Sequence, residues 1–76
     1  MNSIKQGVVS FIFKSSIIEG LNDYRVLANN GITYVGFNLP IDLKVGDEVS
    51  IQTLYIETMH SYIIKSIERN KQLKFA

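Results

Sequence analysis

The sequence predicts a small all-β fold, a sandwich or a barrel, in a single domain that spans residues 1–76. Short runs rich in Val, Ile, Phe, Tyr and Thr recur between turn residues, which is typical of such folds. Hydrophobic residues make up 46% and charged residues 20% of the chain, so we expect it to fold. A domain of this size buries only about 60% of the surface of its unfolded chain. Because the sequence has no cysteine, a disulfide framework and a thiolate metal site are both excluded as added support.

The first three predicted strands are GVVSFIF, YRVLA and ITYVGF, at residues 7–13, 24–28 and 32–37. A polar connection that contains Gly and Asn separates the first two. The second and third flank the Asn-Asn-Gly segment 29–31, and Asn-Gly tolerates the positive φ that tight hairpin turns require. Pro40 ends the third strand, because proline donates no hydrogen bond to a ladder.

The fourth and fifth predicted strands are EVSIQTLYIE and SYIIKSIE, at residues 48–57 and 61–68. Gly46 and Asp47 mark the turn before the fourth strand. The last segment, residues 69–76, fits a short helix or an extra strand, and periodicity over so few residues does not decide between them.

The predicted fourth strand is apolar on both faces toward its end. With a period of two residues, one face holds Val49, Ile51, Thr53 and Tyr55, and the other holds Ser50, Gln52, Leu54 and Ile56. The first strand behaves similarly, with Val9, Phe11 and Phe13 opposed by Val8 and Ile12. Either a strongly twisted barrel covers the second face from within, or the second face is an exposed patch that docks on a subunit or partner. For the second case the predicted interface residues are Phe13, Leu54 and Ile56.

Catalytic chemistry has little support in the sequence. His60 is the only histidine, so a Ser-His or Cys-His nucleophile system would have to use this residue as its base. The carboxylates are scattered and show no metal-site spacing or glycosidase pair, and the glycines match no phosphate-binding loop. We therefore expect no catalytic residue, no metal site, no cofactor and no enzyme activity.

The charges are distributed unevenly along the chain. Residues 65–76 carry four basic residues against Glu68, a net charge of +3, while the rest has four basic and six acidic residues, a net charge of −2. A basic end attracts phosphate, although a solvated terminal segment is the simpler interpretation. A nucleic-acid-binding module would stack bases on exposed aromatic side chains beside cations. The candidates for that role are Tyr24, Arg25, Tyr55, Tyr62, Lys65, Arg69, Lys71 and Lys74. Tyrosines that alternate with aliphatic residues also fit a core.

No apolar run is long enough to span a bilayer as a helix, so we expect no membrane partner. At the N-terminus, Ser10 interrupts the apolar stretch and no signal-peptide cleavage pattern follows. We expect a cytoplasmic protein.

The segments VLANNGITYVGFNLP, LKVGDEVSIQTLYIE and SYIIKSI resemble the N-terminal domain of the RuvA Holliday-junction-binding protein family. In that family a Gly-(Val/Ile)-x-Tyr hairpin is followed by a proline, and a Gly-(Asp/Glu)-x-Val turn then starts a strand that contains a threonine. The resemblance covers about residues 4–67 and implies a five-stranded OB-like Greek-key barrel, with a short C-terminal helix or an extra strand as options. The matching positions are Gly31, Ile32, Tyr34, Pro40, Leu43, Gly46, Glu48, Val49 and Thr53.

Two departures from the family limit what the resemblance implies. The family carries an acidic Glu-Asp pin after its fourth strand, where this sequence has Met59 and His60. Its helix-hairpin-helix domain normally follows the barrel, whereas this sequence ends at Ala76. We therefore expect no complete junction-processing activity. The family also assembles its barrels side by side, and such an assembly would bury the apolar second face.

Three functions from different classes remain open. The first is a non-enzymatic module that acts through protein–protein interaction, by self-association or by docking on a partner that it inhibits or adapts, as a small phage or mobile-element factor would. The second is an OB-fold nucleic-acid-binding protein related to DNA recombination or junction binding. The third is a small-ligand barrel, which we rank last because a five-stranded barrel is usually filled by its own side chains.

Overall fold

The computed structural model describes residues 4–15 and 17–70. These residues form five strands and one turn of 3₁₀-helix: β1 (Ile4–Lys14), β2 (Asn22–Ala28), β3 (Thr33–Leu39), β4 (Glu48–Ile56), η1 (Glu57–Met59) and β5 (Ser61–Arg69). All five predicted strands are confirmed, and β3 ends directly before Pro40, as predicted. The predicted alternatives for the last segment, a helix or a strand, fall largely outside the described residues.

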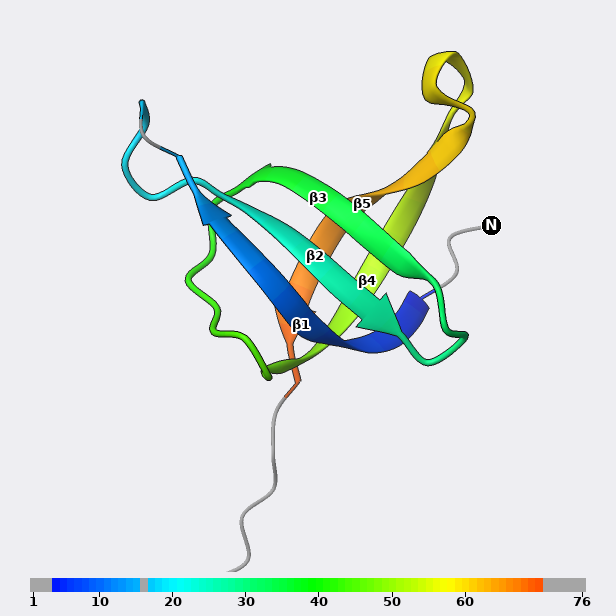
Figure 1. Cartoon of the computed structure of the whole chain (residues 1–76), viewed down its shortest axis with the longest axis horizontal. Coiled ribbons are helices and arrows are strands. Elements are labelled where there is room, and N and C mark those ends of the chain that lie inside the picture. The colour runs from blue at the N-terminus through cyan, green and yellow to red at the C-terminus, as the bar shows by residue number, and fades with distance from the viewer. Residues whose placement is uncertain (1–3, 16, 71–76) are drawn as a thin grey trace, which may run out of the picture.

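The strands close into a barrel in the order β1-β2-β3-β5-β4, which confirms the predicted OB-like barrel (Figure 1). Closure depends on β1, because it pairs antiparallel with both β2 and β4. Gly7 lies where β1 pairs with both neighbours, opposite Ala28 on one side and Val49 on the other. A Cβ atom there would lie 2.6 Å from the Leu27 carbonyl oxygen, so only glycine allows this close approach.

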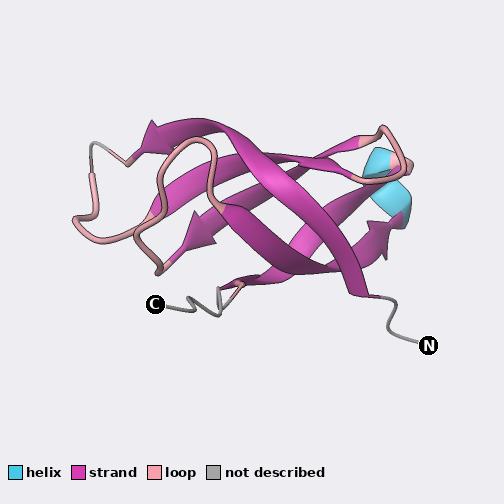
Figure 2. Ribbon diagram, turned by 90° about the horizontal axis from the view of Figure 1, so that it is seen from below, coloured by secondary structure: helices cyan, strands magenta, loops and turns pink. Residues whose placement is uncertain are grey.

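The barrel interior is filled by aliphatic side chains and two tyrosines. Figure 2 shows that the segment between β3 and β4, residues 40–47, lies at the end of the barrel opposite η1. Leu43 from this segment is buried and Ile41 packs against the core, so the segment closes that end. The buried apolar residues are Val9, Tyr24, Val26, Ala28, Tyr34, Leu39, Leu43, Val49, Ile51 and Ile64.

A β-bulge in β1 reverses the predicted faces of the first strand. Val9 pairs with Val26 and Phe11 with the adjacent Arg25, so Ser10 is an extra residue on β1. Its hydroxyl donates a hydrogen bond to the Arg25 carbonyl oxygen. The prediction that Val9, Phe11 and Phe13 share a face is therefore wrong. Val9 points into the core, but beyond the bulge Ile12 packs against the core and both phenylalanines are exposed.

Strands β4 and β5 extend beyond the barrel as a hairpin arm, which we define as residues 55–62 (Figure 1). The predicted alternation of β4 holds within the barrel, where Val49 and Ile51 are buried. Toward the end of β4 there is no barrel interior left to cover the inner face. Tyr55, Met59 and Tyr62 on the arm are consequently exposed.

The turn between β2 and β3 uses one positive φ rather than two. The Gly31 N–H donates to the Ala28 carbonyl oxygen, and the Ala28 N–H donates to the Ile32 carbonyl oxygen. Gly31 has φ of 85°, whereas Asn30 does not take a positive φ. This is the pattern of a type I turn followed by a glycine bulge, and the predicted hairpin forms through it.

The Tyr24 hydroxyl ties the closing segment 40–47 to the barrel. The ring is 1% exposed. Its oxygen donates to the Ile41 carbonyl oxygen and accepts from the Leu43 N–H at 3.1 Å and from Asn22 Nδ2 at 3.0 Å. A hydroxyl has one hydrogen and two lone pairs, so all three capacities are used.

Replacing Tyr24 by phenylalanine is expected to lower the free energy of unfolding by about 1–3 kcal/mol, because the buried Leu43 N–H loses its acceptor. Urea titration followed by circular dichroism measures the change. The control is Tyr62→Phe, whose ring is exposed on the hairpin arm and which should change the value by less than about 0.5 kcal/mol. Equal effects of the two variants would contradict the role assigned to the Tyr24 hydroxyl.

Asp47 fixes the turn that leads into β4. Its carboxylate accepts from the Lys44 N–H at 2.9 Å and forms an ion pair with Arg69 at 3.2 Å. The hydrogen bond from Lys44 lowers the pKa of Asp47 below its ordinary value, and the Arg69 guanidinium lowers it further, together outweighing the opposing loss of hydration.

The stability of the barrel should therefore fall in acid partly through Asp47. A carboxylate whose folded-state pKa is depressed contributes stability that is complete above its unfolded pKa of about 3.9 and is lost as the pH falls through the folded value. Urea midpoints at about pH 6 and about pH 2.5 measure this loss. The urea midpoint of Asp47→Asn should fall less between these two pH values than that of the wild type. The midpoint of the control Asp42→Asn, at an exposed position, should fall by as much as that of the wild type. A full drop in Asp47→Asn would show that other groups account for the acid sensitivity.

Candidate binding face

An outward-facing row of side chains crosses all five strands of the barrel. Directly paired residues on neighbouring strands point to the same side of a sheet. The register joins the members of this row in the order Phe11, Arg25, Val35, Ile63 and Leu54. Phe11 and Leu54 are exposed, and Val35 and Ile63 are half-buried. The second apolar face that the sequence shows thus points to solvent.

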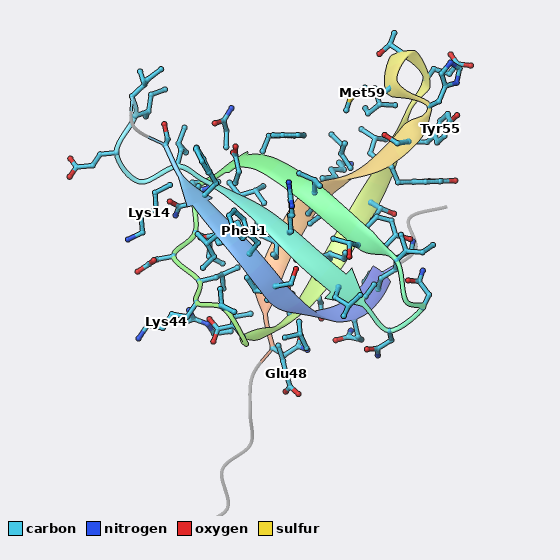
Figure 3. The ribbon with its side chains drawn as sticks, viewed as in Figure 1. Phe11, Lys14, Lys44, Glu48, Tyr55 and Met59 are labelled. Carbon is cyan, nitrogen blue, oxygen red and sulfur yellow. The ribbon has the colours of Figure 1, made fainter. Side chains whose placement is uncertain are left out.

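Two further phenylalanines widen this row into an apolar surface. Phe13, at the end of β1, and Phe37, on β3, line one pocket together with Phe11. The exposed fractions of Phe11, Phe13 and Phe37 are 49%, 62% and 49%. Figure 3 shows Phe11 on the outer side of the layer that β1, β2 and β3 form. We call this surface the phenylalanine face and define it by Phe11, Phe13, Arg25, Val35 and Phe37.

The pocket on the phenylalanine face has a volume of about 150 Å³. It is lined by the three phenylalanines, by Val35 and by two charged residues of β2, Asp23 and Arg25. A pocket of this size holds one or two side chains of a ligand rather than a whole cofactor, because cofactor pockets are roughly 300–1,000 Å³. The remaining lining residue is Tyr24.

The two charged residues of the pocket make different contacts. Asp23 Oδ1 accepts a hydrogen bond of 2.8 Å from the Asn38 N–H, at a point of β3 where Asn38 has φ of 54°. The Arg25 guanidinium lies over the Phe11 ring, 5.4 Å from its centre. A guanidinium stacked on an aromatic ring keeps its N–H donors at the edge available for an anion.

The edge of β1 beside the phenylalanine face lacks a second strand. Ile4 to Val8 pair with β4, but beyond Val8 the described part of the chain pairs β1 with β2 alone. Val9 still bonds to the turn before β4, through Gly46 and Asp47. Residues 10–14 therefore present an open strand edge, which is a hydrogen-bonding template for another extended chain.

The three predicted interface residues lie on the outer side of the barrel wall but at separate places. Leu54 belongs to the outward row, and Ile56 follows it by two residues on the same strand. Phe13 lies at the far end of β1, which Figure 1 places at the end of the barrel opposite the hairpin arm. Only Phe13 belongs to the phenylalanine face.

The structure separates the predicted nucleic-acid candidates. Tyr24 is wrong as a stacking residue, because its ring is buried in the core. Arg25 is exposed on the phenylalanine face, and Lys65 is exposed on β5 at the point where the β4–β5 register shifts. Tyr55 and Tyr62 are exposed, but they pack edge to face on the hairpin arm with ring centres 5.0 Å apart.

The basic residues of the C-terminal segment form no cluster among the residues described. Arg69 donates to the Asp42 carbonyl oxygen at 2.7 Å and pairs with Asp47. Lys71 and Lys74 lie outside the described residues. His60 is exposed at the tip of the hairpin arm with φ of 50°. Within residues 4–15 and 17–70, no three His, Cys, Asp or Glu side chains are grouped so that they could hold a metal ion.

Sequence reasoning missed Phe11 and Phe37 as site residues. One feature of the sequence could have pointed to Phe11: the polar Ser10 interrupts an apolar run. Such a residue fits either a β-bulge, which turns Phe11 outward, or an ordinary outward position in a regular strand. Phe37 was taken only as the end of the third strand. Its outward position follows from the period of two, because Phe37 comes two residues after the outward-facing Val35 on the same strand.

Comparisons with models of protein families, with curated proteins and with solved structures find no match to this chain. Among the described residues, no helix has the length and apolar character needed to cross a bilayer.

The contact between Arg25 and Phe11 should couple the two side chains by about 0.5–1 kcal/mol, the range for an exposed cation–π pair. A double-mutant cycle of Arg25→Gln and Phe11→Leu, followed by urea unfolding, measures this coupling. The matched control cycle pairs Arg25→Gln with Tyr62→Leu on the hairpin arm and should give no coupling. A value near zero in the first cycle would mean that the guanidinium does not rest on the ring in solution.

Proposed function

We propose that this protein is a non-enzymatic binding module and that its phenylalanine face docks on a partner protein. The observation that carries the proposal is the exposure of Phe11, Phe13 and Phe37 around one pocket on the outer side of β1, β2 and β3. Monomeric proteins seldom leave contiguous apolar patches uncovered unless these serve binding. Aromatic and arginine side chains are also the residue types enriched at protein interfaces.

Charge and hydrogen-bonding capacity favour a protein partner. The described residues hold six Lys or Arg and seven Asp or Glu, a net charge of −1. Nucleic-acid affinity comes largely from cations that neutralise phosphates, and the phenylalanine face contributes Arg25 alone. The open edge of β1 beside the face offers backbone groups to an extended polypeptide, which is how many peptide-binding domains gain affinity.

A second candidate function is the binding of single-stranded nucleic acid on the same face. The specific observation in its favour is the stacked Arg25 and Phe11 pair on strands β1 and β2. OB-folds bind oligonucleotides on this side of the barrel by stacking bases on aromatic rings beside cations. This candidate also includes the relation to the RuvA barrel that the sequence resemblance suggests.

The test is a selection from a phage-displayed library of random twelve-residue peptides, followed by fluorescence anisotropy with the selected peptides. We expect peptides that bind the wild type and lose about tenfold or more in affinity for Phe37→Ser, since an aromatic anchor in a pocket is typically a hot spot. The control is Tyr62→Ser, which removes an equally exposed ring from the hairpin arm and should leave binding unchanged.

A mixed-sequence twelve-nucleotide single strand, measured at low and moderate salt, separates the two candidates. Failure to select any Phe37-dependent peptide, together with DNA binding that weakens as salt rises, would overturn the docking proposal in favour of the second candidate.

A further inference from the structure

Arg25 is the cation at the centre of the phenylalanine face, where its guanidinium lies over the Phe11 ring. Its register partners are Phe11 on β1 and Val35 on β3, so apolar side chains flank it on both neighbouring strands. In the part of the chain that the structure describes, no carboxylate oxygen lies within 4.0 Å of its guanidinium. The acid on the same strand, Asp23, already accepts a hydrogen bond from the Asn38 backbone.

A partner that covers the phenylalanine face also takes water away from Arg25. A buried guanidinium without an anion is strongly unfavourable, because its hydration is lost and nothing replaces it. A purely apolar partner would therefore bind poorly. A carboxylate placed over Arg25 restores the lost interactions, and the planar fork of arginine matches a carboxylate with two parallel hydrogen bonds.

The size of the face indicates what kind of partner surface fits. Three phenylalanine rings that are each about half exposed offer on the order of 300 Å² of apolar surface. Two folded domains in a stable complex bury about 800 Å² on each side. The phenylalanine rings alone supply less than that, and the open edge of β1 beside them favours a short extended segment, which adds backbone hydrogen bonds along that edge.

We propose that the phenylalanine face binds a short extended segment of a partner protein, in which a carboxylate flanked by apolar side chains pairs with Arg25. This proposal rests on the proposed docking function and adds the chemistry of the partner. It assigns recognition of the acid to Arg25 and recognition of the apolar side chains to the phenylalanine rings.

The experiment repeats the selection of random twelve-residue peptides on the wild type and on Arg25→Glu. Wild-type pools should be enriched in Asp or Glu beside apolar residues, and Arg25→Glu pools should be enriched in Lys or Arg instead. Circular dichroism of the variant checks the fold, and we expect no change because Arg25 is exposed.

A mutant cycle between peptide and protein gives the second measurement. In a selected wild-type peptide, changing the Glu to Gln should weaken binding to the wild type by about tenfold and leave binding to Arg25→Gln almost unchanged. The Phe37→Ser variant tests the apolar contribution separately, because it removes a ring without touching the cation.

The outcomes distinguish the two proposals. Peptides that depend on Phe37 but show no acidic enrichment and no coupling to Arg25 would overturn the present inference and leave the docking function standing. A selection that yields no Phe37-dependent peptide would overturn the docking function itself. Light scattering that shows a wild-type dimer lost in Phe37→Ser would also overturn the inference, since the occupant would then be a second copy. Single-stranded DNA that displaces the peptides from the phenylalanine face would also overturn the inference, since the occupant would then be a nucleic acid.

Discussion

Closure of the barrel through β1 is the constraint on which the other features depend. One strand must pair with two partners that lie on opposite sides of it, β2 and β4, and must bend between them. Gly7 permits the close approach at the crossing, and the bulge at Ser10 lets β1 leave β4 and continue beside β2 alone. Bulges bend a strand and increase its local twist, which is the deformation that closing a small barrel requires.

The same bulge creates the candidate site. An extra residue changes which side chains face the core, so Ile12 moves inward and the neighbouring phenylalanines move outward. The interior is already filled by Tyr24, Tyr34 and the aliphatic core, and it has no room for them. The phenylalanine face is therefore linked to the geometry of closure, and a substitution that removed the bulge would change the fold and the candidate site together.

Much of the fold, but less of the site, could be predicted from the sequence. Runs of β-branched and aromatic residues bounded by Pro, Gly and Asn located all five strands, because these signals are local. The period of two placed Val49 and Ile51 on one face for the same reason, and in the structure both are buried in the core. The faces of Phe11 and Phe13 were assigned wrongly, since one inserted residue inverts every later side chain of a strand. The sequence left Tyr24 open between a stacking residue and a core residue, because its burial depends on contacts with Ile41 and Leu43, whose position depends on the whole chain.

The single bridge between Val35 and Ile63 divides the barrel into two parts with different folding requirements. Strands β1, β2 and β3 form a meander and β4 and β5 form a hairpin, and both units consist of contacts between neighbours along the chain. The pairing of Gly7 with Val49 instead joins positions about 40 residues apart, and closing such a long loop costs entropy before its contacts are gained. We therefore expect the joining of these two units, rather than the formation of either one, to limit the folding rate. Amide protons along the β1–β4 ladder, rather than those within the meander, report on that step.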